Sequence, residues 1–559
     1  MEEIRGLVEK YALQNAVKYR AAPNPGAVMG KLMGEHPELR SRAREISLLV
    51  RDVLEEVGRG REEEWQRRLE EIAPELLEEL SERKEPEKGL PPLEGAGSGV
   101  VMRFAPNPNG PPTLGSARGI VVNSEYVRRY GGRFILRFDD TDPVKKRPML
   151  EAYGWYLEDC EWLGAQPDEV VRASERIDLY YPIAEELIRR GGAYVCLCPQ
   201  ATFKEHKDRG VPCEHRGQAE ERNMELWRSM LDGGLGEGEA VLRIKTDMSH
   251  RDPAIRDWPA FRIVTAPHPL VGDRYRVWPL LDFESAVEDH LLGTTHIIRG
   301  KDLADSGRRQ RYLYEHLGWE YPSVIHWGRI RIHQFGSFST SKLRRAIESG
   351  EYSGWDDPRI PTVRAMRCRG IRPEALRRFM IDLGVGETDI AISMDSIYAE
   401  NRRLVDPEAN RYFFVWDPVL LQIDGDVPSW ATAPLHPTAN RGFRRIPAGR
   451  SVFLCRSDLE GRSAGDLIRL KDLCNIRITS IDPPRASFAG TAVQKGVRIV
   501  HWAPSGSLRV RVLRPDGVDE GLGEPGIAGE LNRVVQFERY GFVRINRLGD
   551  PIVAYFAHR

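Results

Sequence analysis

Three cysteines and a histidine lie close together in the stretch CLCPQATFKEHKDRGVPCEHR. Cys196 and Cys198 form one pair, and Cys213 and His215 form a second pair after an interval of fourteen residues. Three thiolates and one imidazole make a closed tetrahedral set suited to a structural Zn²⁺ ion. The stretch therefore predicts a zinc site, with His206 as an alternative to His215. A coincidence of reduced cysteines is the competing interpretation.

A second stretch, RFAPNPNGPPTLGSARG, has the composition of a phosphate-binding turn. Gly110 and Gly115 let the backbone approach a ligand closely. Prolines stiffen the same loop: Pro106, Pro108, Pro111 and Pro112. The stretch joins a predicted strand to a predicted helix, whose first N–H groups would face a phosphate. An ordinary rigid strand-to-helix turn is the alternative.

Two arginines end predicted strands of one sheet. Arg103 ends the strand GVVMRF, and Arg299 ends the strand THIIRG. Ligands of parallel α/β sheets bind beyond the carboxyl ends of the strands. Two guanidinium groups facing one pocket are costly unless an anion neutralises them, so the pair favours an anionic ligand. The alternative makes Arg299 an ion-pair partner of Asp302 or Asp305.

The composition is that of a multidomain protein with packed cores. The 559 residues correspond to about three to five domains, and no apolar run approaches the ~20 residues that span a bilayer. The beginning, MEEIRGLVEK, lacks the apolar segment of a secretory signal, so we expect a soluble cytoplasmic protein. The net charge of −1 means that local basic patches must hold any polyanion partner. Seven cysteines in so long a chain do not indicate a disulfide framework.

The elements that must position these residues follow an α/β pattern. Strand 99–104, helix 114–132, strand 133–138 and helix 150–162 make a βαβα unit, the start of a doubly wound parallel sheet. The alternation resumes at THIIRG, so an insertion of roughly 80 residues splits the sheet.

The segments before and after the α/β region have different sequence patterns. Apolar residues recur at helical spacing near the N-terminus, and the segment KEPEKGLPPLEGAGSG that follows has the composition of a linker. Short alternating runs after residue 415 predict one or two β-barrels. Residues 1–96 are predicted to form a helical domain, 97–194 the first half of a Rossmann-type catalytic domain and 195–277 the insertion with its zinc site. Residues 278–345 are predicted to form the second catalytic half, 346–414 a helical connecting domain and 415–559 the β-barrels.

The loop sequence RFAPNPNGPPTLGSAR resembles the first signature of class I aminoacyl-tRNA synthetases in the glutamyl/glutaminyl branch. That signature ends in His-Ile-Gly-His, where this chain has Thr113-Leu114-Gly115-Ser116. The segments WPLLDFESAVEDHLLGTTHIIRGKDL, EYSGWDDPRIPTVRAMRCRGIRPEAL and VVQFERYGF also resemble the branch. The match covers roughly residues 98–559 in the right order, and the chain is similar to glutamyl-tRNA synthetases of the archaeal type.

The resemblance implies an ATP site. The family's histidines donate hydrogen bonds to ATP phosphates, and Thr113 and Ser116 keep one hydroxyl donor each, at a loss of about 1 kcal/mol or about fivefold in rate. The tripeptide Thr340-Ser341-Lys342 resembles the second signature, Lys-Met-Ser-Lys-Ser, with Lys342 as the remaining cation. The expected ATP-binding residues are Pro106, Gly110, Thr113, Gly115, Ser116, Ser341 and Lys342, with Thr113, Gly115, Ser116 and Lys342 as the catalytic set. Mg²⁺ is expected on the phosphates, but no carboxylate is assigned to it.

The resemblance also implies a glutamate pocket. Arg103 and Arg299 are expected to contact the substrate side chain, because glutaminyl relatives have a smaller neutral residue at position 299. An acidic substrate would then be preferred roughly 10³-fold or more. Asp139 is expected to bind the α-ammonium group, with Asp140 and Asp142 as alternatives. Leu281 lies where relatives often have a tyrosine.

The expected partner is tRNA. The segment RAMRCRGIRPEALRR supplies Arg364, Arg367, Arg369 and Arg372 for a phosphate backbone, and a salt-bridged solvent face is the alternative. By resemblance, the insertion contacts the acceptor end and the barrels contact the anticodon. The predicted reaction joins L-glutamate to tRNA-Glu, and to tRNA-Gln in some relatives, through glutamyl-adenylate. A glutaminyl enzyme and a catalytically inactive tRNA-binding paralogue are the rival hypotheses.

Overall fold

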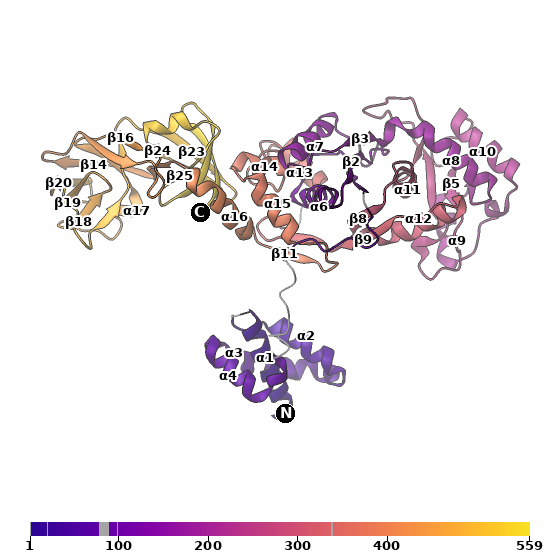
Figure 1. Ribbon diagram of the computed structural model, residues 1–559, viewed down its shortest axis with the longest axis horizontal. Helices are drawn as coiled ribbons and strands as arrows, with labels where there is room; N and C mark the ends of the chain where they lie inside the picture. The colour runs from indigo at the N-terminus through magenta and orange to yellow at the C-terminus, as the bar shows by residue number, and fades with distance from the viewer. Residues whose placement is uncertain (1, 20, 78–88, 98, 337–338) are drawn as a thin grey trace. The chain divides into compact units, whose positions relative to one another are not determined.

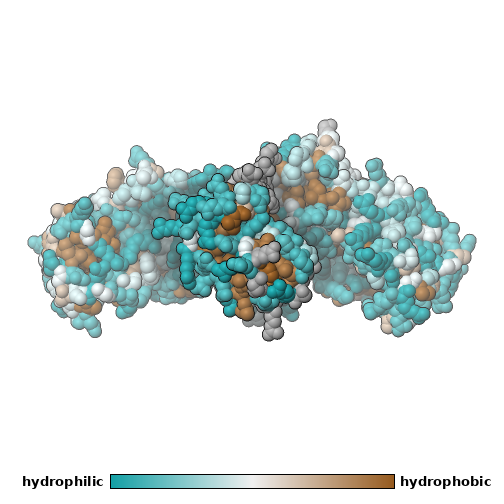
Figure 2. All heavy atoms as spheres, turned by 90° about the horizontal axis from the view of Figure 1, so that it is seen from below, coloured by the Kyte–Doolittle hydropathy of each residue, from teal (hydrophilic) through white to brown (hydrophobic). Residues whose placement is uncertain are grey.

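The computed structural model describes residues 2–19, 21–77, 89–97, 99–336 and 339–559. The chain divides into two compact units, Met1–Lys88 and Gly89–Arg559. Figure 2 shows a surface that is mostly hydrophilic on the side it presents, with separate small hydrophobic areas. No described helix is both long enough and apolar enough to cross a membrane.

The first unit is helical, as predicted. Its helices are α1 (Glu2–Tyr19), α2 (Pro25–Glu35), α3 (Ala43–Gly58) and α4 (Glu62–Ile72). The predicted apolar positions of α1 and α3 meet in one core, in which Val8, Val50 and Val57 are buried. Helix α4 ends two residues before Pro74, because proline cannot supply the amide that the helix would need.

The second unit begins earlier than predicted. Residues 84–88 and 98 of the predicted linker lie outside the described residues, but Leu90 and Leu93 are buried against Val100 and Tyr126. The Leu93 amide donates to the Tyr130 hydroxyl at 3.0 Å. The boundary therefore falls at 88/89 and not at the predicted 96/97. Two leucines among prolines and glycines carry no periodicity from which their burial could be predicted.

A five-stranded parallel sheet forms the centre of the second unit (Figure 1), in the order β3-β2-β1-β8-β9. Its strands are β1 (Val100–Phe104), β2 (Gly132–Phe138), β3 (Glu169–Arg172), β8 (His296–Gly300) and β9 (Ser323–Trp327). Helices α6 (Leu114–Tyr130), α7 (Leu150–Trp162) and α12 (Ala304–Leu317) lie between them in the chain. The predicted doubly wound pattern is confirmed, and β3 is a strand that the sequence analysis did not predict.

The insertion folds around its own antiparallel sheet, in the order β4-β5-β6-β7. Its elements are α8 (Ile177–Arg189), β4 (Ala193–Cys196), α9 (Gln200–Arg209), α10 (Glu220–Asp232), β5 (Val241–Ile244), β6 (Pro259–Ile263) and β7 (Val277–Pro279). Trp227, Trp258 and Trp278 fill its core. Helix α11 (Leu281–Leu291) then leads back to β8 of the central sheet.

Beyond the sheet, β10 (Ile330–Ile332) pairs in parallel with β11 (Ile390–Ile392). The helices here are α13 (Thr340–Glu348), α14 (Val363–Arg369), α15 (Pro373–Asp382) and α16 (Asp395–Val405). Helices α14, α15 and α16 fall within the predicted helical connection, residues 346–414, whereas β10 and most of α13 precede it.

Two barrel-like seven-stranded sheets complete the chain, in the orders β12-β25-β26-β27-β23-β24-β13 and β21-β18-β19-β20-β14-β17-β22. The first contains β12 (Arg411–Tyr412), β13 (Phe414–Trp416), β23 (Leu508–Arg514), β24 (Gly517–Gly523), β25 (Val534–Phe537), β26 (Gly541–Arg547) and β27 (Ile552–His558). The second contains β14 (Pro418–Asp424), β17 (Ser451–Cys455), β18 (Leu467–Leu470), β19 (Cys474–Ser480), β20 (Arg485–Phe488), β21 (Arg498–Val500) and β22 (Ala503–Pro504). A separate ribbon pairs β15 (Trp430–Pro434) with β16 (Phe443–Pro447).

Candidate functional site

The loop after β1 leads directly into the first turn of α6. Thr113 caps this helix, because its Oγ1 accepts a hydrogen bond from the Ser116 amide at 3.4 Å. The same Oγ1 lies 3.3 Å from the Ser116 Oγ. The two predicted hydroxyl donors therefore sit side by side at the helix N-terminus, where free amides and the helix dipole favour an anion.

The two glycines of this loop differ in what a side chain at their position would contact. A Cβ on Gly110 would lie 2.4 Å from the Thr340 Cγ2, so this glycine lets the loop pack against the beginning of α13. A Cβ on Gly115 would meet only the Thr113 Oγ1, at 3.6 Å. Outside its own stretch of helix, no other described atom lies within 4 Å of that position, so the described residues leave space beside Gly115 for a ligand.

The contact with Thr340 brings the second predicted signature to the loop. Ser339 caps α13 by accepting from the Lys342 amide at 3.4 Å. The side chains of Ser341 and Lys342 are exposed, and Lys342 forms no ion pair with any described residue. Lys342 is therefore an exposed cation two residues from the contact between Thr340 and the loop.

The loop is also tied to the end of β2. The Pro106 carbonyl accepts from the Asp139 amide at 3.0 Å, and the Asn107 Nδ2 donates to the Asp139 carbonyl at 2.9 Å. The Asp139 carboxylate accepts from the Arg137 Nε at 2.7 Å. The predicted ATP loop and the predicted ammonium ligand are therefore neighbours.

The other two aspartates have structural partners. Asp140 is buried and accepts from the Tyr153 hydroxyl at 2.5 Å and from the Ser174 amide at 2.8 Å. Burial raises the pKa of Asp140 to about 6. Asp142 accepts from loop amides and forms an ion pair with Arg262 at 3.0 Å. Asp139 is also paired, with Arg137, but its backbone groups bind the predicted ATP loop, so it stays the candidate ammonium ligand among the three.

Arg103 is already paired with a buried carboxylate, which the sequence analysis did not predict. Its Nε and Nη2 donate to the two carboxylate oxygens of Asp289 at 2.7 and 3.2 Å. Arg137 donates to the same carboxylate at 2.8 Å. Burial alone would raise the pKa of Asp289, but Arg103 and Arg137 hold it down to about 2. Asp289 is thus an ionised carboxylate that neutralises part of the pocket.

Arg299 retains donors without partners. Its Nη1 donates to the Gln310 Oε1 at 3.0 Å, and its Nη2 lies 3.9 Å from the Asp289 Oδ2. The buried Nε and Nη2 atoms have no hydrogen-bond partner among the described residues. Burial lowers the pKa of Arg299, but a guanidinium remains charged in proteins. The alternative, an ion pair of Arg299 with Asp302 or Asp305, is absent from the described contacts, since Asp302 pairs with Arg329 and Asp305 with Arg308.

Helix α11 contributes residues that the sequence analysis missed. Asp289 and Glu284 face the arginines from this helix, and Ser285 accepts from Gln310 at 2.8 Å. Leu281, the predicted pocket residue, begins the helix with 42% of its surface exposed. Acids at positions 284, 288 and 289 beside the apolar residues Phe283, Ala286 and Val287 were the available signal, because a buried face with charges needs opposite charges elsewhere.

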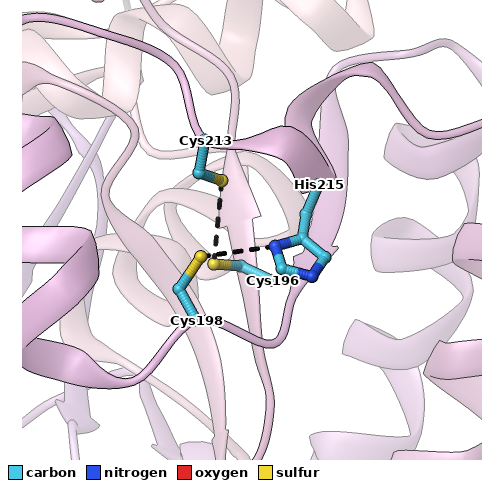
Figure 3. A group of neighbouring side chains, drawn as sticks. All are labelled: Cys196, Cys198, Cys213 and His215. Atoms are coloured by element: carbon cyan, nitrogen blue, oxygen red, sulfur yellow. Dashed lines mark hydrogen bonds between the residues drawn. The ribbon is translucent and has the colours of Figure 1, made fainter.

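The four predicted metal ligands converge (Figure 3). The Cys196 and Cys213 sulfurs are 4.0 Å apart, and the Cys198 sulfur lies 3.3 Å from the His215 Nδ1. All four ligand atoms lie within 4.8 Å of one another. Ligands of one tetrahedral Zn²⁺ lie about 3.3–3.8 Å apart, given its bond lengths of 2.0–2.3 Å. His215 completes the cluster, so the alternative with His206 is not needed, and the thiols are free.

The predicted RNA-binding arginines separate into different environments. Arg369 is buried and donates to the Phe556 and Ala557 carbonyls at 3.0 and 2.8 Å. It joins α14 to β27 and cannot contact RNA, which corrects the prediction. Arg364 forms an ion pair with Glu158 at 2.6 Å, and Arg372 forms one with Glu408. Arg367 is exposed and forms no ion pair with a described residue.

The β15–β16 ribbon carries an exposed aromatic face that was not predicted. Trp430 and Phe443 are 56% and 73% exposed. The Arg445 guanidinium lies 3.6 Å from the centre of the Trp430 ring. The register pairs Thr432 with Arg445 and Pro434 with Phe443, so these side chains share one face of the ribbon. Exposed rings interleaved with an arginine are typical of surfaces on which unpaired bases stack.

Comparisons with known proteins agree with this architecture. The family described as tRNA synthetases class I (E and Q), catalytic domain, matches residues 99–407. Two families described as anti-codon binding domains of the same synthetases match residues 409–491 and 499–546.

Relatives match along the whole chain. A glutamate–tRNA ligase of Methanothrix thermoacetophila is 70% identical, with 100% of both chains covered. One from Methanosarcina mazei is 58% identical over 100% of this chain and 99% of the relative. A solved glutamate tRNA ligase from Elizabethkingia meningosepticum, at 20% identity and a TM-score of 0.41, covers 55% of this chain and 70% of its own.

Proposed function

The chain belongs to the class I tRNA synthetases for glutamate and glutamine, and from this premise we propose that it ligates L-glutamate to tRNA. ATP and glutamate would first form glutamyl-adenylate and diphosphate. The terminal ribose hydroxyl of tRNA would then take the glutamyl group and release AMP.

The choice of glutamate rests on Arg299. Its two unpartnered nitrogens are buried at a strand end, in the same cluster as Asp139. Unpaired buried donors cost free energy that a ligand carboxylate would recover as charge-assisted hydrogen bonds. The amide of glutamine offers a neutral acceptor only. Arg103 acts in this proposal through Asp289, which holds it in place, and Asp139 would take the α-ammonium group.

Activation needs the phosphates held while the α-carboxylate attacks the α-phosphorus. The amides of α6 and the hydroxyls of Thr113 and Ser116 would bind phosphate oxygens, and Lys342 would neutralise charge as diphosphate leaves. Mg²⁺ supplies further neutralisation in such reactions. We assign it no protein ligand.

The tRNA would extend from the catalytic sheet to the C-terminal sheets. The match to anti-codon binding domains supports contact with the anticodon there, and we place one contact on the Trp430–Arg445–Phe443 face of the ribbon. Arg367 would contact a backbone phosphate.

We further propose that the Cys196–Cys198–Cys213–His215 cluster binds structural Zn²⁺. The ligand types and spacings support a closed site that fixes the end of β4 against the turn at 213–215. Metal analysis of the purified protein should give one zinc per chain, and Cys198→Ser should lose it together with thermal stability of the insertion. A wild-type chain free of zinc after purification without chelators would contradict this site.

Exchange of ³²P between diphosphate and ATP tests the reaction. We expect exchange with glutamate in the presence of tRNA, followed by glutamyl transfer to tRNA-Glu, and the same assays with a tRNA-Gln transcript define the second partner. Exchange with glutamine alone would identify a glutaminyl enzyme. Tight tRNA binding without exchange under any condition would identify an inactive paralogue.

A further inference from the structure

Glu284 is a buried acid without a hydrogen-bond donor. It lies on α11 with no exposed surface, and neither carboxylate oxygen accepts a hydrogen bond from a described residue. The nearest cation is the Arg137 Nε, 3.8 Å from the Glu284 Oε1. That nitrogen already donates to Asp139 at 2.7 Å, so it is committed elsewhere.

Among the residues that the structure describes, the groups around Glu284 offer no other donor to its carboxyl group. Tyr180 on α8 donates to Glu288 at 2.8 Å, and Arg176 donates to the same Glu288 oxygen at 2.8 Å. Arg103 and the Arg137 Nη1 both donate to the Asp289 carboxylate. Arg299 on β8 is directed toward Gln310 and Asp289. The remaining neighbours are the carboxylates of Asp139, which lies on the same Arg137 Nε, and of Glu288, and both repel a second negative charge.

We propose that Glu284 is a positioning residue that determines substrate specificity. It works as a neutral acid whose proton is shared with Asp139, and the pocket is thereby left with one excess positive charge. A buried ionised carboxylate without donors is much less stable than its protonated form. The O–H of the protonated acid provides Asp139 with a donor and fixes the carboxylate that takes the α-ammonium. Burial, followed by the charge of Asp139, raises the pKa of Glu284 well above its ordinary value.

The charge balance links this proton to the choice of substrate. Three guanidinium groups, of Arg103, Arg137 and Arg299, face the carboxyl groups of Asp139, Asp289 and Glu284, and with one proton held between Glu284 and Asp139 these three acids carry two negative charges. Bound glutamate carries one net negative charge and bound glutamine carries none, so the excess cation favours glutamate. An ionised Glu284 would balance the arginines and remove this preference. The inference about selectivity rests on the proposed function, whereas the protonation of Glu284 does not.

Infrared difference spectroscopy of the unliganded full-length protein measures the proton directly. At pH 8 the wild type minus Glu284→Gln spectrum should contain the carbonyl stretch of a protonated carboxyl group. Working at pH 8 keeps Asp140 and Asp159, with pKa values raised by burial to about 6 and about 7, largely ionised. Glu288→Gln is the matched control, since Glu288 accepts from Arg176 and Tyr180, and it should leave the band in place. A carboxylate band in place of the carbonyl stretch would overturn the proposal even if the protein charges tRNA.

Binding calorimetry then tests the selectivity. The amide of Glu284→Gln imitates a neutral acid, so the ratio of glutamate to glutamine affinity at pH 8 should stay within about threefold of the wild-type ratio. Titration of Glu284 at higher pH should lower the wild-type ratio by about 10- to 100-fold and leave the ratio of Glu284→Gln unchanged. Both ligands share the α-amino group, whose titration cancels in the ratio. A loss of more than tenfold in Glu284→Gln at pH 8, or an equal alkaline fall in both proteins, would reject the role in selectivity.

Discussion

The arginines at the strand ends and the arginines of α14 are the same residue type with opposite surroundings. Arg103, Arg137 and Arg299 are buried around one aspartate, and the fully buried donor atoms of this set that have no described partner belong to Arg299. Around α14, Arg364 is half-buried in an ion pair, and Arg369 is buried against main-chain carbonyls. The first set leaves a charge for a ligand, whereas the second uses most of its charges to hold the fold together.

The difference shows that the partner of an arginine decides its role more than its position in a motif does. A guanidinium paired with carbonyls at the seam between α14 and β27 stabilises that seam. Arg299 donates to the neutral amide of Gln310 and shares the more distant Asp289 carboxylate with two other arginines, so it is positioned but only partly neutralised. Four substitutions test this contrast.

Arg299→Gln should have the largest effect. The substitution removes the charge that favours glutamate, so kcat/KM for glutamate should fall by about 10³-fold or more, while the value for glutamine should fall much less. Steady-state charging of tRNA-Glu measures both. Arg299→Lys is the control that keeps the charge and should recover part of the loss. If Arg299→Gln retains glutamate efficiency within tenfold, the open donors of Arg299 are not the basis of selectivity.

Arg369→Ala should destabilise the protein without changing its RNA affinity. The carbonyls of Phe556 and Ala557 and the Tyr398 hydroxyl would lose a charged donor, at a cost of about 3 kcal/mol in the free energy of unfolding. Urea denaturation followed by circular dichroism measures the stability, and filter binding at a temperature where the variant is folded measures tRNA affinity. A folded Arg369→Ala protein with a normal unfolding midpoint and weakened tRNA binding would return Arg369 to the RNA surface.

These two residues mark where sequence reasoning succeeded and where it stopped. Periodicity predicted the sheet and the position of Arg299 near the carboxyl end of β8. The spacing of the Cys and His ligands predicted a cluster that the fold brings together. The Asp289 partner of Arg103 is 186 residues away and the β27 partners of Arg369 are 187 and 188 residues away, and no local pattern carries such pairings.

Trp430→Ala should weaken tRNA binding by about tenfold, since one stacked base contributes about 1–3 kcal/mol. The ribbon then supplies the RNA contact that α14 mostly lacks. The salt dependence of binding should remain that of the wild type, because stacking releases no counterions. Tyr19→Ala, which removes an aromatic residue that is 60% exposed in the first unit, is the control and should have no effect. Wild-type affinity in Trp430→Ala would exclude the ribbon from the interface.

Arg367→Ala should have the smallest effect. It tests whether Arg367 contacts RNA, unlike Arg364 and Arg369 on the same helix, which have protein partners. Arg367 is exposed, and its side chain pairs with no described carboxylate, so a phosphate contact would cost little desolvation. Its loss should reduce tRNA affinity about two- to fivefold and lower the slope of log affinity against log salt by about one. Arg364→Ala is the matched control on the same helix, because its charge is already paired with Glu158 and its removal should leave the salt slope unchanged. Equal slopes for wild type and Arg367→Ala would mean that α14 contributes no phosphate contact at all, and the contrast with the strand-end arginines would then be complete.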